Sequence, residues 1–185
     1  AYLTQSAASF SMSGVLPWAL PAGEIGVAYG AEWRLERHGQ YKIDSYSQAG
    51  MYPSGNFGSN FEGRQHVEEG FLEVAIPILK DQFVQTLNLD LAGRLTNYST
   101  SGLVKTWKLG LTSQVNDDVR LRATLSADIR APDITELFTN AKYGVTPERY
   151  PPVTGASYNI YQVTTGNPEL TPEQATTVSG GVVLT

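Results

Sequence analysis

The sequence predicts an all-β protein, an antiparallel up-and-down meander of about seven long strands that forms part of a transmembrane β-barrel. Three observations predict this class. Apolar and polar residues alternate over long stretches, both long connections fall on the same side of an up-and-down path, and charges avoid the middle of the apolar faces. Two long loops are expected on one side of the sheet.

The alternation is clearest over four stretches, residues 24–38, 86–96, 105–115 and 119–130. In the second stretch, Leu87, Leu89 and Leu91 are separated by Asn88 and Asp90. Because successive side chains of a strand point to opposite faces, this pattern predicts one apolar and one polar face. Weaker alternation predicts further strands over residues 1–13, 67–78 and 175–185, and no long helix is predicted.

The expected connections between strands differ in length. In chain order they are moderate (14–23), long (39–66), short (79–83), short (99–103), very short (116–118) and very long (130–174). Alternate connections of an up-and-down path lie on the same side of a sheet, so both long loops fall on one side, which we call the outer side. The segment "VNDDV" at 115–119 predicts a tight hairpin, because Asn and Asp tolerate turn dihedrals.

Two architectures contain such strands: a soluble β-sandwich, whose apolar face packs on a second sheet, and a membrane barrel, whose apolar face contacts lipid. The expected strands are longer than ordinary strands of about five or six residues, and their polar face carries charges of both signs. On the apolar face the clear charges, Arg37 and Lys105, lie only at outer ends. Two aromatic girdles are expected, with Trp33 and Trp107 near the outer loops and Trp18 and Phe83 at the opposite turns. These features favour the barrel.

The composition excludes several classes of protein. Of the 185 residues, 17% are charged and the net charge is −5, which disfavours a general nucleic-acid surface. The absence of cysteine excludes disulfides and thiolate metal sites. No apolar run is long enough for a transmembrane helix, and no signal peptide is visible. The sequence starts and ends within expected strands, so we expect a piece of a larger protein.

The stretch "VRLRATLSADIRAPDITELF" at 119–138 changes from a strand to a turn that is marked by proline. Pro132 has no backbone donor and disfavours helical geometry at the preceding residue, so the strand should end there. Asp133 can cap a short helical turn that carries three apolar residues, Ile134, Leu137 and Phe138. The very long loop, which contains six prolines, follows.

That stretch and the later "GNPELTPEQATTVSGGV" resemble the barrel of TonB-dependent outer-membrane receptors. In that family a strand ending in Arg-Ala-Pro, a Glu-Leu-Phe segment, a long loop and a strand start with Gly-Asn-Pro recur together. Here they are Arg130-Ala131-Pro132, Glu136-Leu137-Phe138 and Gly166-Asn167-Pro168-Glu169-Leu170-Thr171-Pro172-Glu173. The segments "GEIGVAYGAEWRLE", "GFLEVAIPIL" and "LDLAGRLTNYSTSGLVKTWKLGL" also resemble successive barrel strands, so the resemblance covers nearly the whole chain. Asp128-Ile129 departs from the residues usual before Arg-Ala-Pro.

The resemblance implies that residues 1–185 are part of a receptor barrel, without the plug domain and the remaining strands of a barrel of about twenty-two. It implies an outer-membrane active transporter that binds and imports a scarce nutrient, such as a ferric siderophore, haem, cobalamin or an oligosaccharide. Energy would come from the TonB complex through the missing plug domain. The other implied partners are the lipid bilayer and the small nutrient, with no nucleic acid. A passive porin-like barrel is a close relative of this function.

The alternative from another class is a soluble β-sandwich that serves as the ligand-binding module of a secreted protein. It requires that protein covers the face of Leu87, Leu89 and Leu91. An enzyme is not predicted, because the sequence contains no nucleophile elbow, phosphate loop, zinc-helix motif or calcium loop. No cofactor or metal site is predicted, since His38 and His66 flank the first long loop without a third ligand nearby.

Charged residues on the polar face are expected to face the lumen or the plug: Glu32, Arg34, Arg94, Arg120, Arg122 and Arg130. Glu32 and Glu36, with Arg34 between them, could resemble an acid–base site, but we favour a ladder of charges paired with neighbouring strands or a plug. The last three arginines could attract an anionic ligand or hold plug carboxylates, and we favour the plug.

Seven of the ten tyrosines lie in the two long loops and are candidates for ligand binding: Tyr41, Tyr46, Tyr52, Tyr143, Tyr150, Tyr158 and Tyr161. Loop aromatics with few charges around them suit stacking on a planar or sugar-like ligand. The alternative is that these aromatics pack the loops against each other.

Overall fold

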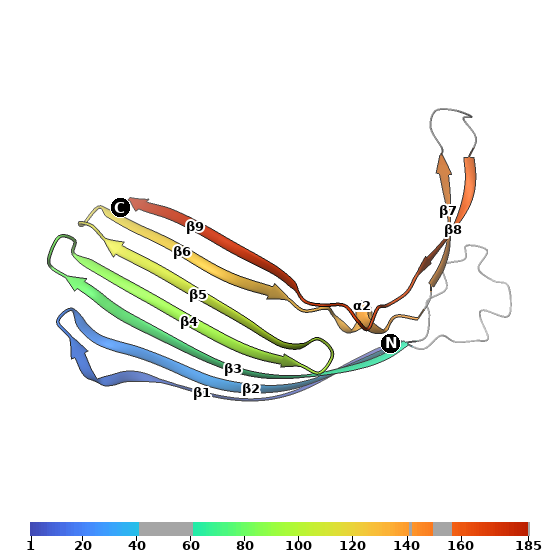
Figure 1. Ribbon diagram of the computed structural model, residues 1–185, viewed down its shortest axis with the longest axis horizontal. Helices are drawn as coiled ribbons and strands as arrows, with labels where there is room; N and C mark the ends of the chain where they lie inside the picture. Colours follow the sequence, from blue (N-terminus) through green and yellow to red (C-terminus); the bar gives the residue numbers. More distant parts are fainter. Residues whose placement is uncertain (41–60, 141, 150–156, 185) are drawn as a thin grey trace. The chain divides into compact units, whose positions relative to one another are not determined.

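A computed structural model describes residues 1–40, 61–140, 142–149 and 157–184, and the side-chain surroundings of these residues outside 142–162. Seven strands form one sheet (Figure 1): β1 (Tyr2–Leu20), β2 (Gly23–Gln40), β3 (Phe61–Lys80), β4 (Thr86–Tyr98), β5 (Gly102–Gln114), β6 (Val119–Arg130) and β9 (Glu173–Leu184). Between β6 and β9 the chain forms a short helix, α2 (Ile134–Phe138), and a two-stranded sheet of β7 (Lys142–Arg149) and β8 (Ser157–Thr164). The predicted all-β meander of seven strands is confirmed. Within the described ranges, no helix has the length and apolar character needed to cross a membrane.

The strands of the large sheet pair in chain order, and β9 pairs with β6. The register places four apolar residues in one row across β4, β5, β6 and β9: Leu91, Leu109, Leu125 and Val178. The neighbouring row, across the same strands, consists of Asp90, Gly110, Thr124 and Ser179. Because side chains alternate along each strand, the two rows lie on opposite faces of the sheet. The predicted division into an apolar and a polar face is confirmed.

The apolar face has no second sheet over it in the described part of the chain. Leu109 and Val178 keep 39% and 78% of their surface exposed, and Trp33 and Trp107 keep 42% and 45%. Soluble monomeric proteins rarely leave so many neighbouring large apolar side chains in water. This exposure disfavours the β-sandwich alternative, which requires a second sheet that buries this face.

β1 is longer than the sequence predicts. The moderate connection expected over 14–23 is a tight turn at Pro21 and Ala22, because β1 continues to Leu20. Gly14 and Pro17 interrupt the alternation of the sequence, but both lie within the strand. Proline is tolerated in edge strands, and β1 is an edge strand of this sheet.

The hairpin expected at 115–119 is confirmed. The Val115 amide donates to the Val119 carbonyl over 2.9 Å. Asn116 Oδ1 accepts hydrogen bonds from the amides of Asp118 (3.0 Å) and Val119 (2.9 Å). The asparagine side chain therefore supplies the acceptor that lets two strands reverse direction within a few residues.

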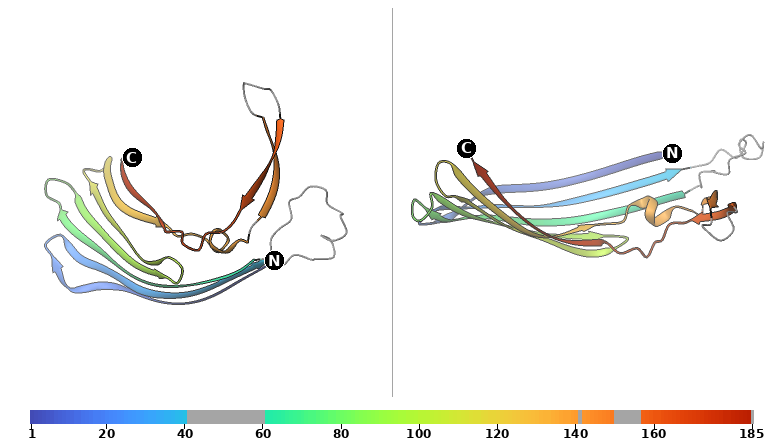
Figure 2. Two further views of the ribbon diagram at one scale, coloured as in Figure 1. Left: turned by 45° about the vertical axis from the view of Figure 1, so that its right-hand side comes forward. Right: turned by 90° about the horizontal axis from the view of Figure 1, so that it is seen from above.

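The chain divides into two compact units. The first, which we call the sheet unit, contains residues 6–34, 66–131 and 171–185. The second, which we call the loop unit, contains residues 1–5, 35–65 and 132–170. In the loop unit β7 and β8 pair as a hairpin (Figure 2), with Lys142 opposite Thr164 and Arg149 opposite Ser157.

The hairpin of β7 and β8 corrects the expected loop over 130–174, where the sequence predicts a helical turn but no strands. Gly144 and Pro147 lie within β7, and both residues are uncommon in strands. The segment also lacks the regular alternation of apolar and polar residues by which a strand is recognised in a sequence. These strands are defined by the hydrogen-bonded pairing of the two segments, and the pattern of residues in the sequence does not reveal that pairing.

The helix α2 forms where the sequence predicts a capped turn, so that prediction is confirmed. Asp133 Oδ1 accepts hydrogen bonds from the amides of Thr135 (2.7 Å) and Glu136 (2.8 Å). In return, Glu136 Oε2 accepts from the Asp133 amide over 2.9 Å. This reciprocal arrangement is a capping box, and it satisfies amide groups that would otherwise have no partner at the start of the helix.

Within the loop unit, α2 packs directly on the backbone of β3. A Cβ atom at Gly63 would lie 2.5 Å from both Ile134 Cγ2 and Phe138 Cδ2, so a side chain at this position would collide with the helix. Leu137, on the same helix, keeps only 1% of its surface exposed. The helix and the start of β3 therefore form a small apolar core of the loop unit.

We expect Asp133→Ala to destabilise the α2 segment by about 1 kcal/mol, because the change removes the acceptor for two amides. Amide hydrogen exchange at residues 135–138 of the full-length protein should become faster. Asp133→Ser is the matched control, since serine also caps helices, and should keep most of the protection. Unchanged exchange in the alanine variant would show that the cap does not stabilise this segment.

Candidate functional site

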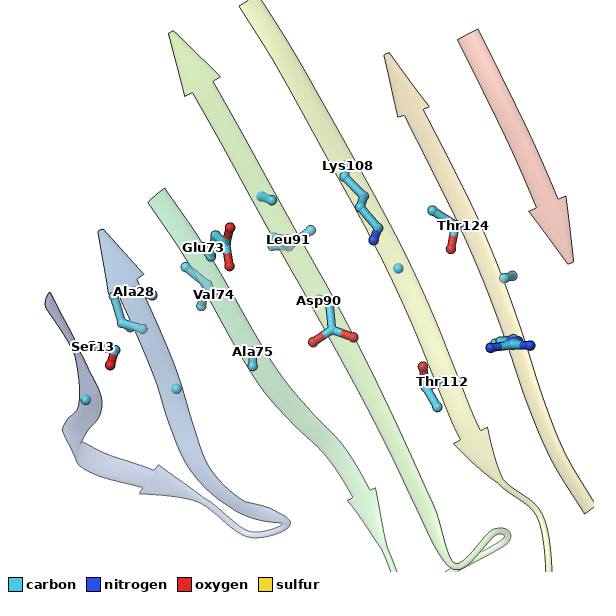
Figure 3. Close-up of a pocket in the computed structure, with 17 residues that line it drawn as sticks. Ser13, Ala28, Glu73, Val74, Ala75, Asp90, Leu91, Lys108, Thr112 and Thr124 are labelled. Carbon is cyan, nitrogen blue, oxygen red and sulfur yellow. The ribbon is translucent and has the colours of Figure 1, made fainter. Parts of the chain in front are cut away.

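A groove of about 660 Å³ lies on the polar face of the sheet unit. Residues from β1 to β6 line it, and Figure 3 shows the side chains of Glu73, Asp90, Lys108 and Thr112. Between these side chains the groove is lined by small residues: Gly26, Ala28, Ala75, Ala92 and Gly110. A groove that is lined by small residues and bordered by charged side chains is suited to hold a polar ligand or another polypeptide segment.

The charges of the groove are arranged by sign across the sheet. Glu73 and Asp90 belong to β3 and β4, whereas Lys108 and Arg122 belong to β5 and β6. The register places Ala92 between Glu73 and Lys108, so their backbones are two strand spacings of about 4.8 Å apart. Among the described residues, no ion pair joins these four side chains. The groove therefore presents acidic groups on one side and basic groups on the other.

A second cluster on the polar face holds Arg94. Its Nη1 atom lies 3.0 Å from Glu69 Oε1, and Thr96 Oγ1 donates to Glu69 Oε2 over 3.0 Å. The guanidinium carbon lies 5.7 Å from the centre of the Phe71 ring, within the range of a cation–π contact. Gly30 leaves room for this ring, because a Cβ atom there would lie 2.7 Å from Phe71 Cε1. The ion pair and the ring together orient the guanidinium group.

Two of the predicted arginines bind residues of the neighbouring strands. Arg130 of β6 donates to both carboxylate oxygens of Glu173 on β9, over 2.9 and 3.2 Å. Arg120 Nε donates to Gln114 Oε1 on β5 over 2.6 Å. Both pairs are directly opposite each other in the register. These contacts agree with a ladder of paired charges, while contact with a plug or a lumen stays a prediction.

The group of Glu32, Arg34 and Glu36 forms contacts within the sheet. Arg34 Nη1 lies 3.0 Å from Glu32 Oε1, and Gln5 Nε2 donates to Glu36 Oε1 over 3.3 Å. Both carboxylates therefore have partners on neighbouring residues of the sheet. The arrangement therefore supports charge pairing over an acid–base site.

Sequence reasoning did not single out Glu73, Asp90 and Lys108, although all three line the groove. The alternation of the sequence does place all three on the polar face, since each has the same parity along its strand as the predicted polar-face residues. The missing information was the register, which places small residues such as Ala92 and Gly110 between the charges.

The structure does not test the tyrosines predicted to bind a ligand. Tyr41, Tyr46, Tyr52 and Tyr150 lie outside the described residues. In the hairpin, the register places Tyr143 opposite Val163, Tyr158 opposite Glu148 and Tyr161 opposite Val145. The side-chain surroundings of these three tyrosines lie outside the part of the chain that the structure describes.

The two histidines have separate surroundings. His38 contacts the Phe61 ring edge-on, with 4.9 Å between the ring centres. The backbone amide of His66 donates to Ser99 Oγ over 3.0 Å. Throughout the described ranges, no group of three or more His, Asp or Glu side chains is arranged to hold a metal ion.

Comparison with known proteins agrees with the fold. A family model described as the TonB dependent receptor-like β-barrel matches residues 2–185. A search of curated proteins found no match. Among solved structures, the siderophore receptor PirA from Acinetobacter baumannii has a similar fold, with 17% sequence identity and a TM-score of 0.64. The similarity covers 99% of this chain and 25% of that receptor, so this chain spans about a quarter of the receptor's length. Because the family model matches almost every residue, the chain belongs to the TonB-dependent receptor-like β-barrel family.

Proposed function

We propose that the chain forms part of the wall of a bacterial outer-membrane transporter that binds a scarce nutrient and imports it with energy supplied through TonB. The family match over residues 2–185 is the observation that carries this proposal. The two faces of the sheet support it, because the apolar face is exposed as lipid contact requires and the opposite face is grooved and charged. The lipid bilayer is thus one partner of this chain.

This chain would then be a partial barrel within a longer protein that has further strands and a plug domain. The large sheet ends in β1 on one side and β9 on the other, and an open edge inside a membrane would leave backbone groups without hydrogen bonds. Further strands would satisfy these groups. The plug would then face the groove, where Lys108 and Arg122 are available for its carboxylates and Glu73 and Asp90 for its basic groups.

The ligand class proposed first is a ferric siderophore, and haem, cobalamin and oligosaccharides are the other candidates. The similar solved structure is described as a siderophore receptor, and this description orders the candidates. The seven loop tyrosines remain our candidates for ligand contact, because aromatic loops at the outer side suit capture by stacking.

Energised uptake by the full-length protein tests this proposal. The protein would be produced in a bacterial strain that lacks its own receptors, and uptake of radiolabelled ferric siderophores, haem, cobalamin and oligosaccharides would be measured with and without TonB. We expect binding in both strains but accumulation only where TonB is present. Accumulation that is independent of TonB would instead support a passive porin-like barrel, and a lack of binding to every candidate would contradict the proposed ligand classes.

A further inference from the structure

The apolar face of the sheet unit contains a hollow of about 670 Å³ over Gly70 of β3. We propose that this hollow holds one acyl chain of a phosphate-bearing membrane lipid. The inference rests on the proposed function only in requiring that this face contacts the bilayer. It adds a specific lipid site to a surface that would otherwise contact lipid without selectivity.

The hollow arises because two neighbouring strands, β2 and β3, carry small residues here, whereas the residues around them are large. Ala31 of β2 and Gly70 of β3 have little or no side chain, whereas Phe10, Trp33 and Leu95 border them and keep much of their surface exposed. A Cβ atom added at Gly70 would have no neighbour closer than the Gly30 carbonyl oxygen at 3.9 Å. Protein atoms therefore leave this space open, and its apolar walls fit hydrocarbon.

The rim of the hollow offers polar groups for a lipid headgroup. Glu68 and Asn97 line it and pair with each other in the register. Lys105 of β5 is exposed, and the register places it opposite Leu95 of β4. The ammonium group of Lys105 and the amide of Asn97 can donate to phosphate and ester oxygens, whereas the Glu68 carboxylate repels a phosphate. The phosphate is therefore expected on the Lys105 side, with the acyl chain over Gly70.

The neighbouring strand provides a matched control for filling the hollow. Gly93 of β4 has the parity of the apolar face, pairs with Leu72 and Trp107, and does not line the hollow. A Cβ atom at Gly93 would meet nothing within 4 Å. Gly93→Leu therefore adds the same side chain to the same face as Gly70→Leu, but only the latter occupies the proposed lipid site.

The experiment uses the full-length receptor, stripped of lipid in dodecyl maltoside and titrated with dioleoylphosphatidylglycerol, with bound lipid counted by native mass spectrometry. We expect one lipid to bind more tightly than the rest in wild type and in Gly93→Leu. Gly70→Leu should weaken that binding by roughly tenfold or more, since a leucine displaces a comparable apolar area of lipid. Lys105→Gln should weaken it by a smaller factor, because one charged contact to the phosphate is lost. Equal binding by Gly70→Leu and wild type would overturn the proposal.

Heat-modifiable migration on a gel shows whether each variant has folded. If Gly70→Leu does not fold, the double variant Trp33→Ala/Leu95→Ala takes its place, because it removes the walls of the hollow instead of filling it. Unchanged lipid binding by that variant would likewise reject the site. The transport assay is independent of the lipid assay. Selective lipid binding without TonB-dependent uptake would reject nutrient import only, and uptake without a selectively bound lipid would reject the lipid site only.

Discussion

We expect Leu125→Arg to impair insertion of the full-length receptor into lipid, at a cost of about 2–4 kcal/mol if position 125 lies near the bilayer midplane. Leu125 is in the middle of β6, on the apolar face, between Leu109 of β5 and Val178 of β9. Both neighbours are exposed, so an arginine among them would meet hydrocarbon and not protein. The free energy of folding into lipid vesicles, measured by urea titration with heat-modifiable migration as the readout, would give this cost directly.

Thr124→Arg is the matched control for this change. Thr124 is adjacent to Leu125 on the same strand but belongs to the opposite face, where the register places it between Gly110 and Ser179. Asp90 lies beyond Gly110 in the same row, so the added guanidinium group would find an acidic side chain within the groove. We expect little loss of folding free energy for this variant. An equal loss for both variants would contradict the assignment of the two faces.

The second large effect is expected for Gly166→Ala, which should destabilise the loop unit by about 1–3 kcal/mol. A Cβ atom at Gly166 would lie 2.7 Å from the Leu137 carbonyl oxygen and 2.7 Å from the Thr139 amide nitrogen. Both contacts are with backbone, which cannot rotate away as a side chain can. The same glycine donates its amide to the Thr139 carbonyl over 2.7 Å, and Asn167 donates to the Glu136 carbonyl over 2.9 Å. The segment after β8 is therefore joined to α2 through a close approach that only glycine permits.

Hydrogen exchange of the Gly166 and Asn167 amides in the full-length receptor measures this effect. We expect much faster exchange in Gly166→Ala, together with easier proteolysis within residues 132–170. Gly93→Ala is the control, since a Cβ atom there has open space around it. Wild-type protection in Gly166→Ala would show that the two segments move apart without cost, and that the contact does not organise the loop unit.

Local features of this fold could be predicted because they depend on residues close together in the chain. The alternation along 119–130 predicts which side chains of β6 share a face, and the register confirms it. Pro132 and Asp133 predict where the strand ends and where α2 begins, since a missing donor and a capping carboxylate act within one turn. Asn116 predicts the hairpin before β6 for the same reason.

Other features could not be predicted because the decisive contacts are distant in the chain. The hairpin of β7 and β8 has no strong alternation, so only the pairing of two polar segments identifies it. β1 continues through Gly14 and Pro17, because a place at the edge of the sheet outweighs their low preference for strands.

By itself the sequence determined the class of fold, the two faces of each strong strand and the family, since periodicity and motifs are properties of the chain read in order. Only the tertiary structure decided which residues form the sites. The groove exists because register sets Ala92 between Glu73 and Lys108, and the hollow exists because Gly70 lies beside Leu95. Register is set by hydrogen bonds between strands and by packing across them, and neither is contained in the pattern of one strand alone.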